Sequence, residues 1–218
     1  MIPLRDLNPT RSTPWLTWLL VLGNIAVFVY EVSLGDAVAG FVRQYGLVAS
    51  DMTSQIAKSG FSPERNLLPW VTHMFVHGGW LHLIGNVWFL HLFGDNIEDR
   101  LGRGRFLVLY FGGGLLAALT QVVVSPASVT PMVGASGAIS AILAAYLLYF
   151  PKAPILTLFF IFFIPLPAFL FIGVWFAMQL IYGQGALESG LQDSVAWWAH
   201  IGGFVGGLVL AILLKKRA

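Results

Sequence analysis

Residues 134–150 read GASGAISAILAAYLLYF and contain no charged side chain. Ser136, Ser140 and Ala144 recur at intervals of four, so in a helix they share one face made only of small side chains. Small faces let helix backbones approach closely in lipid, where van der Waals packing holds helices together. Pro151 ends the run. The stretch therefore predicts a compact membrane helix that packs closely against a neighbouring helix.

The composition of the whole chain also indicates a membrane protein. Of its 218 residues, 57% are hydrophobic and 10% are charged, and the mean hydropathy is +0.79. A soluble globular domain carries about 25% charged residues, so the outer surface of this chain must face the lipid bilayer. Cysteine is absent, which excludes disulfides, thiol nucleophiles and thiolate metal or iron–sulfur sites. The net charge of +2 is too small to suggest a nucleic-acid partner.

The apolar runs predict an all-α bundle of six transmembrane helices in one domain, residues 15–214, because roughly 20 apolar residues cross about 30 Å of hydrocarbon. The fifth run is interrupted by Pro165 and Pro167, and each proline favours a kink. Residues 33–79 read as a long loop at the membrane interface. The predicted spans cover residues 15–32, 80–93, 106–124, 134–150, 155–182 and 195–214. The charged cluster after the second span predicts a solvated turn: Asp95, Glu98, Asp99 and Arg100.

The basic residues predict the orientation of these spans. Nine of the twelve Lys and Arg residues lie in the two terminal segments and in the second and fourth loops. The positive-inside rule places this side in the cytoplasm, so residues 1–14 form a cytoplasmic segment and residues 215–218 a basic cytoplasmic tail. The first span exceeds the usual length of a signal-peptide core, which favours a retained anchor over a cleaved signal. We expect a multi-pass protein of the plasma (inner) membrane if the source is prokaryotic.

A few polar side chains lie inside the spans, where they are costly and mark functional sites by default. His82 and Asn86 share one face of the second span, Ser136 begins the fourth, and His200 lies near the start of the sixth. These three spans all start on the non-cytoplasmic side, so the four side chains lie at similar depth below that surface. We expect an active site there, because the fourth and sixth helices would pack through small residues: Gly134, Gly137, Gly203 and Gly207.

The chemistry of these side chains fits nucleophilic catalysis. A serine becomes a nucleophile when a base within about 2.6–3.2 Å takes its proton, and neutral imidazole is such a base. Ser136 and His200 therefore predict a catalytic dyad. His82, Asn86 and the backbone N–H of Ser136 are candidate donors to the oxyanion of acyl transfer. Asp193 precedes His200 by seven residues and falls in the loop above, so no acidic third member is predicted.

The Gly134-Ala135-Ser136-Gly137 start of one span, His200 with Gly203 and Gly207, and His82 with Asn86 together resemble the rhomboid family of intramembrane serine proteases. The resemblance covers essentially the whole chain. It implies that Ser136 is the nucleophile, that His200 is the general base, and that His82, Asn86 and the Ser136 amide bind the oxyanion. It also implies hydrolysis in or near transmembrane segments of other membrane proteins, without metal or cofactor.

Three features of the chain leave parts of the resemblance open. The fifth helix of the family is proposed to admit substrate from the lipid, which makes Trp175 and Phe176 candidate gate residues; a static kink with lipid-facing aromatics explains them equally well. Some relatives carry an aromatic residue four positions after the nucleophile, where this chain has Ser140. What orients the histidine is therefore open, as is the anchoring of the first loop, where Trp70 has no clear arginine counterpart.

Other functions remain as alternatives. A catalytically silent relative that binds transmembrane helices would share the fold, but such a protein normally lacks the serine or the histidine. A small transporter would explain polar groups within spans, yet no acidic residue lies in the middle of a span to relay ions. The spacing of His73, His77 and His82 would also suit metal ligands, but the H-E-x-x-H pattern is absent. For His73 and His77 this favours a role in interfacial structure or water handling.

Overall fold

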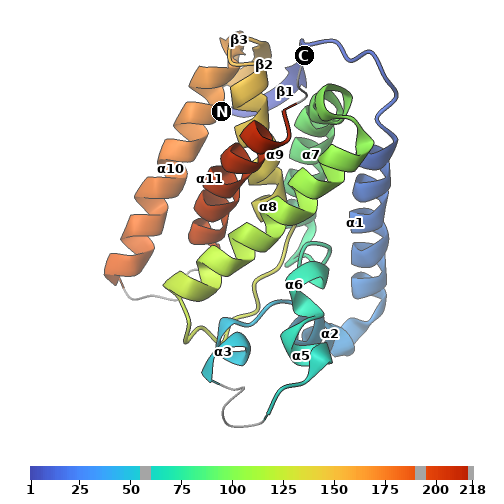
Figure 1. Cartoon of the computed structure of the whole chain (residues 1–218), viewed down its shortest axis with the longest axis vertical. Coiled ribbons are helices and arrows are strands. Elements are labelled where there is room, and N and C mark those ends of the chain that lie inside the picture. The colour runs from blue at the N-terminus through green and yellow to red at the C-terminus, as the bar shows by residue number, and fades with distance from the viewer. Residues whose placement is uncertain (55–59, 190–194, 216–218) are drawn as a thin grey trace.

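The computed structural model describes residues 1–54, 60–189 and 195–215. Within these ranges, six helices of 14 residues or more form the bundle in Figure 1. Three of them, α1, α8 and α10, are long and apolar enough to cross a membrane, and two others, α9 and α11, are apolar but shorter. The chain is therefore a mainly helical membrane protein. The six helices are α1 (Trp15–Ser33), α7 (Trp80–Leu101), α8 (Arg103–Val124), α9 (Ser136–Tyr149), α10 (Ala168–Ser189) and α11 (Trp197–Leu213).

Helix α9 forms the centre of the bundle, and residues 137–146 are all buried. Its neighbour α11 crosses it at glycines. A Cβ added to Gly207 would lie 2.2 Å from Ala141 Cα, and one added to Gly203 would lie 2.2 Å from the Gly137 carbonyl oxygen. The backbones of the two helices are thus in direct contact, which only residues without a side chain permit.

The fifth apolar run does not form one helix, and that part of the span prediction was wrong. Its first part is a hairpin, and α10 begins only at Ala168. Pro165 and Pro167 lie in the edge strand of a sheet, where a missing backbone N–H costs no ladder bond, so they cause no helix kink. The antiparallel sheet has the order β1 (Ile2–Asp6), β2 (Pro154–Phe159) and β3 (Phe162–Pro167).

The charged cluster that was expected to form a solvated turn belongs to α7, which continues to Leu101. Glu98 is buried, and its carboxylate accepts hydrogen bonds of 2.8–3.1 Å from the backbone N–H groups of Leu16 and Thr17 and from the Thr17 hydroxyl. A carboxylate at a helix N-terminus satisfies N–H groups that have no partner within the helix. The turn prediction was wrong because this side chain caps α1 instead of facing water.

The connection between α1 and α7 is a folded cap at the end of the bundle opposite the sheet (Figure 1). Trp70 anchors it: its ring packs against an apolar cluster that includes Leu47 and Val122, and its indole N–H donates to the Asn66 carbonyl at 3.0 Å. The anchoring contact is therefore largely apolar. The cap comprises η1 (Gly35–Ala37), α2 (Val38–Tyr45), α3 (Ala49–Met52), α5 (Pro63–Asn66) and α6 (Pro69–Thr72).

Candidate active site

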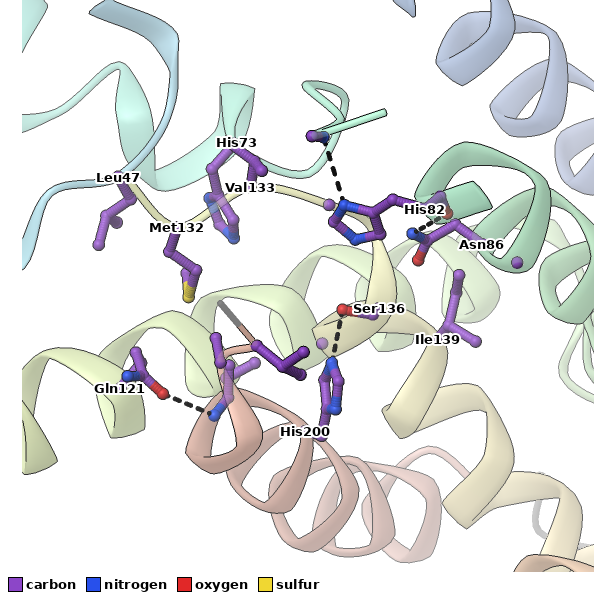
Figure 2. Close-up of a pocket in the computed structure, with 18 of the residues that line it drawn as sticks. Leu47, His73, His82, Asn86, Gln121, Met132, Val133, Ser136, Ile139 and His200 are labelled. Atoms are coloured by element: carbon purple, nitrogen blue, oxygen red, sulfur yellow. Dashed lines mark hydrogen bonds between the residues drawn. The ribbon is translucent and has the colours of Figure 1, made fainter. Parts of the chain in front are cut away.

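Ser136 and His200 meet where the two central helices cross. Ser136 is the first residue of α9 and His200 the fourth of α11, and the close glycine contacts let both side chains face one cavity. The Ser136 Oγ lies 2.7 Å from His200 Nε2, and a dashed line marks this hydrogen bond in Figure 2. This distance lies within the range over which an imidazole removes the proton of a hydroxyl group.

The other ring nitrogen of His200 has a partner that sequence reasoning missed. His200 Nδ1 lies 2.8 Å from the side-chain oxygen of Gln179 on α10. Trp175 and Trp197 flank the imidazole, each with its ring centroid 6.2 Å away. Ser140 faces elsewhere, since its hydroxyl donates to the Ser136 carbonyl at 2.7 Å within α9. The aromatic neighbours of the histidine therefore come from α10 and α11.

His82 lies across the cavity from His200 (Figure 2). The backbone N–H of Gly78 donates to His82 Nδ1 at 3.3 Å, so Nε2 carries the ring proton. This N–H faces Gly134, where an added Cβ would lie 2.5 Å from Nε2. Gly134 also has a φ of 108°, a conformation that residues with a side chain rarely adopt. Gly134 therefore shapes the cavity before α9 begins, whereas Gly137, Gly203 and Gly207 lie at helix contacts.

Asn86 lies one helical turn after His82 on α7 and is buried. Its side-chain nitrogen donates to the His82 carbonyl at 2.8 Å. Since an amide nitrogen carries two hydrogens, one remains for a ligand in the cavity. Within the described part of the chain, the Asn86 side-chain oxygen has no hydrogen-bond partner.

The cavity that these side chains line has a volume of about 620 Å³. Its walls come from α7, α8, α9 and α11, from Trp175 of α10, from the cap and from the segment that precedes α9. Two short contacts hold that segment in place: the Gly134 N–H donates to the His73 carbonyl at 2.8 Å, and Met132 forms a β-bridge with Leu47. The folded cap therefore supports one wall of the site.

His73 lines the cavity, and His77 packs beside His82 with ring centroids 5.2 Å apart. The His73 ring bonds to the Pro69 carbonyl at 2.8 Å, and His77 Nδ1 lies 3.0 Å from the Phe75 carbonyl. Burial lowers the pKa of each to about 4, so both are neutral at pH 7. Among the residues that the structure describes, no three His, Cys, Asp or Glu side chains lie together as metal ligands.

The remaining predicted site residues differ in their surroundings. Trp175 lines the cavity, whereas Phe176 stacks on Phe204 of α11 at a centroid distance of 4.2 Å. Phe176 is therefore half-buried, with one face of its ring against α11. Asp193 lies outside the described residues.

Comparisons with known proteins all lead to proteins described as rhomboid. A family profile described as "Rhomboid domain" matches residues 64–217. The chain is 28% identical to "RHOMBOID-like protein 6, mitochondrial" of Arabidopsis thaliana, over 95% of this chain and 71% of that protein. It is 36% identical to "Presenilin-associated rhomboid-like protein A, mitochondrial" of Danio rerio, but over only 39% of this chain and 23% of that protein. A Bacillus subtilis protein whose name includes the words rhomboid protease is 30% identical over 67% of each chain.

Proposed function

The chain belongs to the rhomboid family, and on that premise we propose that it is an intramembrane serine endopeptidase that cuts other membrane proteins in or near their transmembrane segments. One observation carries the proposal: the 2.7 Å contact between Ser136 Oγ and His200 Nε2 within a cavity of the bundle. An imidazole so placed turns a weakly nucleophilic hydroxyl into an attacking group.

In the proposed reaction, Ser136 Oγ attacks the carbonyl carbon of the scissile peptide bond while His200 Nε2 takes the hydroxyl proton. The tetrahedral intermediate collapses, the C–N bond breaks, and His200 returns the proton to the leaving amine. Water then attacks the acyl ester with His200 again as base, and the C–O bond to Ser136 breaks. The serine hydroxyl is regenerated with its proton, so no other reactant is consumed.

The negative charge on the intermediate needs donors, and the proposed ones are the Nε2–H of His82, the free amide hydrogen of Asn86 and the backbone N–H of Ser136. The hydrogen bond from Gly78 to His82 Nδ1 supports this role, because it leaves the proton on the nitrogen that faces the cavity. The amide of Ser136 is one of the N–H groups at the start of α9 that have no partner within the helix.

Replacing His82 by alanine is expected to lower the rate of cleavage by about 10²-fold, since loss of one oxyanion donor costs about 10²–10³ in rate. His91→Ala is the matched control, because His91 is exposed on the same helix and does not line the active-site cavity. Both variants are compared by their initial rates of cleavage of a single-pass membrane substrate in liposomes. Equal rates for the two variants would contradict the proposed oxyanion role.

We further propose that all six helices cross the membrane, with both termini in the cytoplasm and the active site opening on the other side. The sheet formed by residues 2–6 and 154–167 would then lie in the cytoplasm, and the folded cap on the non-cytoplasmic side. In a prokaryotic cell the membrane would be the plasma membrane. Substrates would enter past α10, with Trp175 and Phe176 as the proposed gate.

Labelling with a fluorophosphonate probe tests the proposed activity without knowledge of the substrate. We expect the purified protein in liposomes to react covalently with the probe, because only an activated serine does so readily. His200→Ala is expected to lose this reaction by about 10²–10⁴-fold, the usual contribution of a general base. Labelling of unchanged rate in folded His200→Ala would rule out the dyad.

A further inference from the structure

We propose that Gln179 is the positioning residue of the active site: through its hydrogen bond from α10, it holds His200 in the tautomer and orientation that Ser136 requires. The inference rests on the proposed function. It also means that α10 must sit against α11 for the base to be aligned, because Gln179 is carried by α10.

The contacts of the Gln179 amide determine which atom faces the histidine. Its nitrogen donates to the Trp175 carbonyl, one turn back in α10, at 3.1 Å. The side-chain oxygen is therefore directed toward His200, 2.8 Å from Nδ1. An oxygen can only accept, so Nδ1 must carry the ring proton and Nε2 must present its lone pair to the Ser136 hydroxyl. This is the tautomer that acts as a base.

The burial of Gln179 supports a specific role. Its side chain is 6% exposed, while its neighbours Met178 and Leu180 are 43% and 44% exposed. A buried amide in an apolar helix is costly unless both of its ends are paired, and here both are. The chain has no charged residue between Lys152 and Glu188. The other glutamine of α10, Gln184, is exposed, so burial is what distinguishes Gln179.

The groups around His200 show why a neutral acceptor matters. Ser136 faces it from α9, Gln179 and Trp175 from α10, and Trp197 from its own helix. The titratable side chain of His82 on α7 faces it across the cavity. Within the described ranges, no carboxylate hydrogen-bonds to the imidazole. Gln179 thus occupies the place that an aspartate takes in a catalytic triad, and it orients the ring without adding a charge to the membrane interior.

Helix α10 otherwise contacts α11 through aromatic packing. Phe176 stacks on Phe204, Tyr182 stacks on Trp197 with centroids 5.0 Å apart, and the Trp198 indole donates to the Gly183 carbonyl at 3.1 Å. Of the three candidate spans, α10 is the least buried, and it lies at the edge of the bundle in Figure 1. Displacement of α10 would therefore break the bond to His200 while leaving the Ser136–His200 helix crossing in place.

The test compares Gln179→Leu with Gln184→Leu, the same change at an exposed glutamine on the same helix. The measured quantities are the rate of fluorophosphonate labelling at saturating probe, k2, and the probe concentration for half-saturation, KI. We expect Gln179→Leu to lower k2 by about 10- to 100-fold, part of the contribution of a general base, with KI within twofold of the parent. Gln184→Leu should retain both values.

A second variant covers the case in which Gln179→Leu does not fold. Gln179→Glu keeps an acceptor beside Nδ1, so we expect it to retain labelling within several-fold. It should also move the acidic limb of the pH–rate profile upward by about one pH unit, because a carboxylate stabilises the protonated imidazole. The positioning role would be overturned if folded Gln179→Leu had the k2 of the parent, or if the acidic limb of Gln179→Glu did not move. Neither result would contradict the proposed function. A parent protein whose labelling does not depend on Ser136 would overturn the proposed function with it.

Discussion

Replacing Ser136 by alanine is expected to abolish cleavage of a single-pass membrane substrate, with a loss of about 10³-fold or more. The variant removes the atom that attacks the scissile peptide bond in the first step of the proposed reaction, and the oxyanion donors that remain supply a small part of the rate. Fluorophosphonate labelling should disappear with cleavage. Both are measured on protein reconstituted in liposomes of one composition.

When two residues act together in catalysis, the losses of rate caused by replacing each of them do not add. A double variant therefore gives a stricter test of this prediction. A Ser136→Ala, His200→Ala double variant should be no slower than the slower single variant, because each change alone already disables the pair. Ser140→Ala is the matched control one turn along α9, since that hydroxyl bonds to the Ser136 carbonyl and faces away from His200. Cleavage retained by folded Ser136→Ala would eliminate the serine mechanism.

Replacing Gly207 by valine is expected to have the largest effect on stability. The first carbon of the new side chain would lie 2.2 Å from Ala141 Cα and 2.4 Å from Ala141 Cβ. No rotamer change relieves an overlap with backbone, so α9 and α11 must separate, and overpacking of this kind costs typically 1–3 kcal/mol or more. We expect a lower midpoint of thermal unfolding in detergent, together with loss of activity as Ser136 and His200 move apart.

Gly173→Val provides the control, because Gly173 lies in α10 and an added Cβ meets no atom within 4 Å. The same loss of glycine and gain of a β-branched side chain is thus tested where space is available. The midpoints of thermal unfolding, monitored by tryptophan fluorescence, distinguish the two variants. Equal midpoints would show that the backbone contact between α9 and α11 does not limit stability.

The sequence contained most of the information that places Ser136 and His200. Spacings of three and four residues identify the small faces of α9 and α11, and the starts of the spans fix a shared depth. The role of Gln179 could not be inferred in the same way. Its contact joins two helices across 21 residues, and a single glutamine in an apolar run does not indicate which way it faces.

The β-hairpin before α10 was missed for a different physical reason. A two-residue hairpin turn normally contains Gly, Asn or Asp, because positive φ is needed there. Here the turn is Phe160-Ile161, and Phe160 itself adopts a φ of 53°. Without a turn signal, the largely apolar residues 155–167 merge with the helix that follows. In the same way, a buried carboxylate such as Glu98 looks like a solvated charge until its partners in α1, about 80 positions away, are known.

The pairing of β1 with β2 has a consequence for the order in which the protein is made. Asp6 pairs with Ile155 and Ile2 with Leu158, so the first strand leaves the ribosome about 150 residues before its partner. At about 5–20 residues per second, synthesis of that interval takes roughly 8–30 s. Four of the long helices are complete before the sheet can close. Residues 2–6 therefore have no strand partner during the synthesis of that interval, and they reach their native positions after four of the long helices have been made.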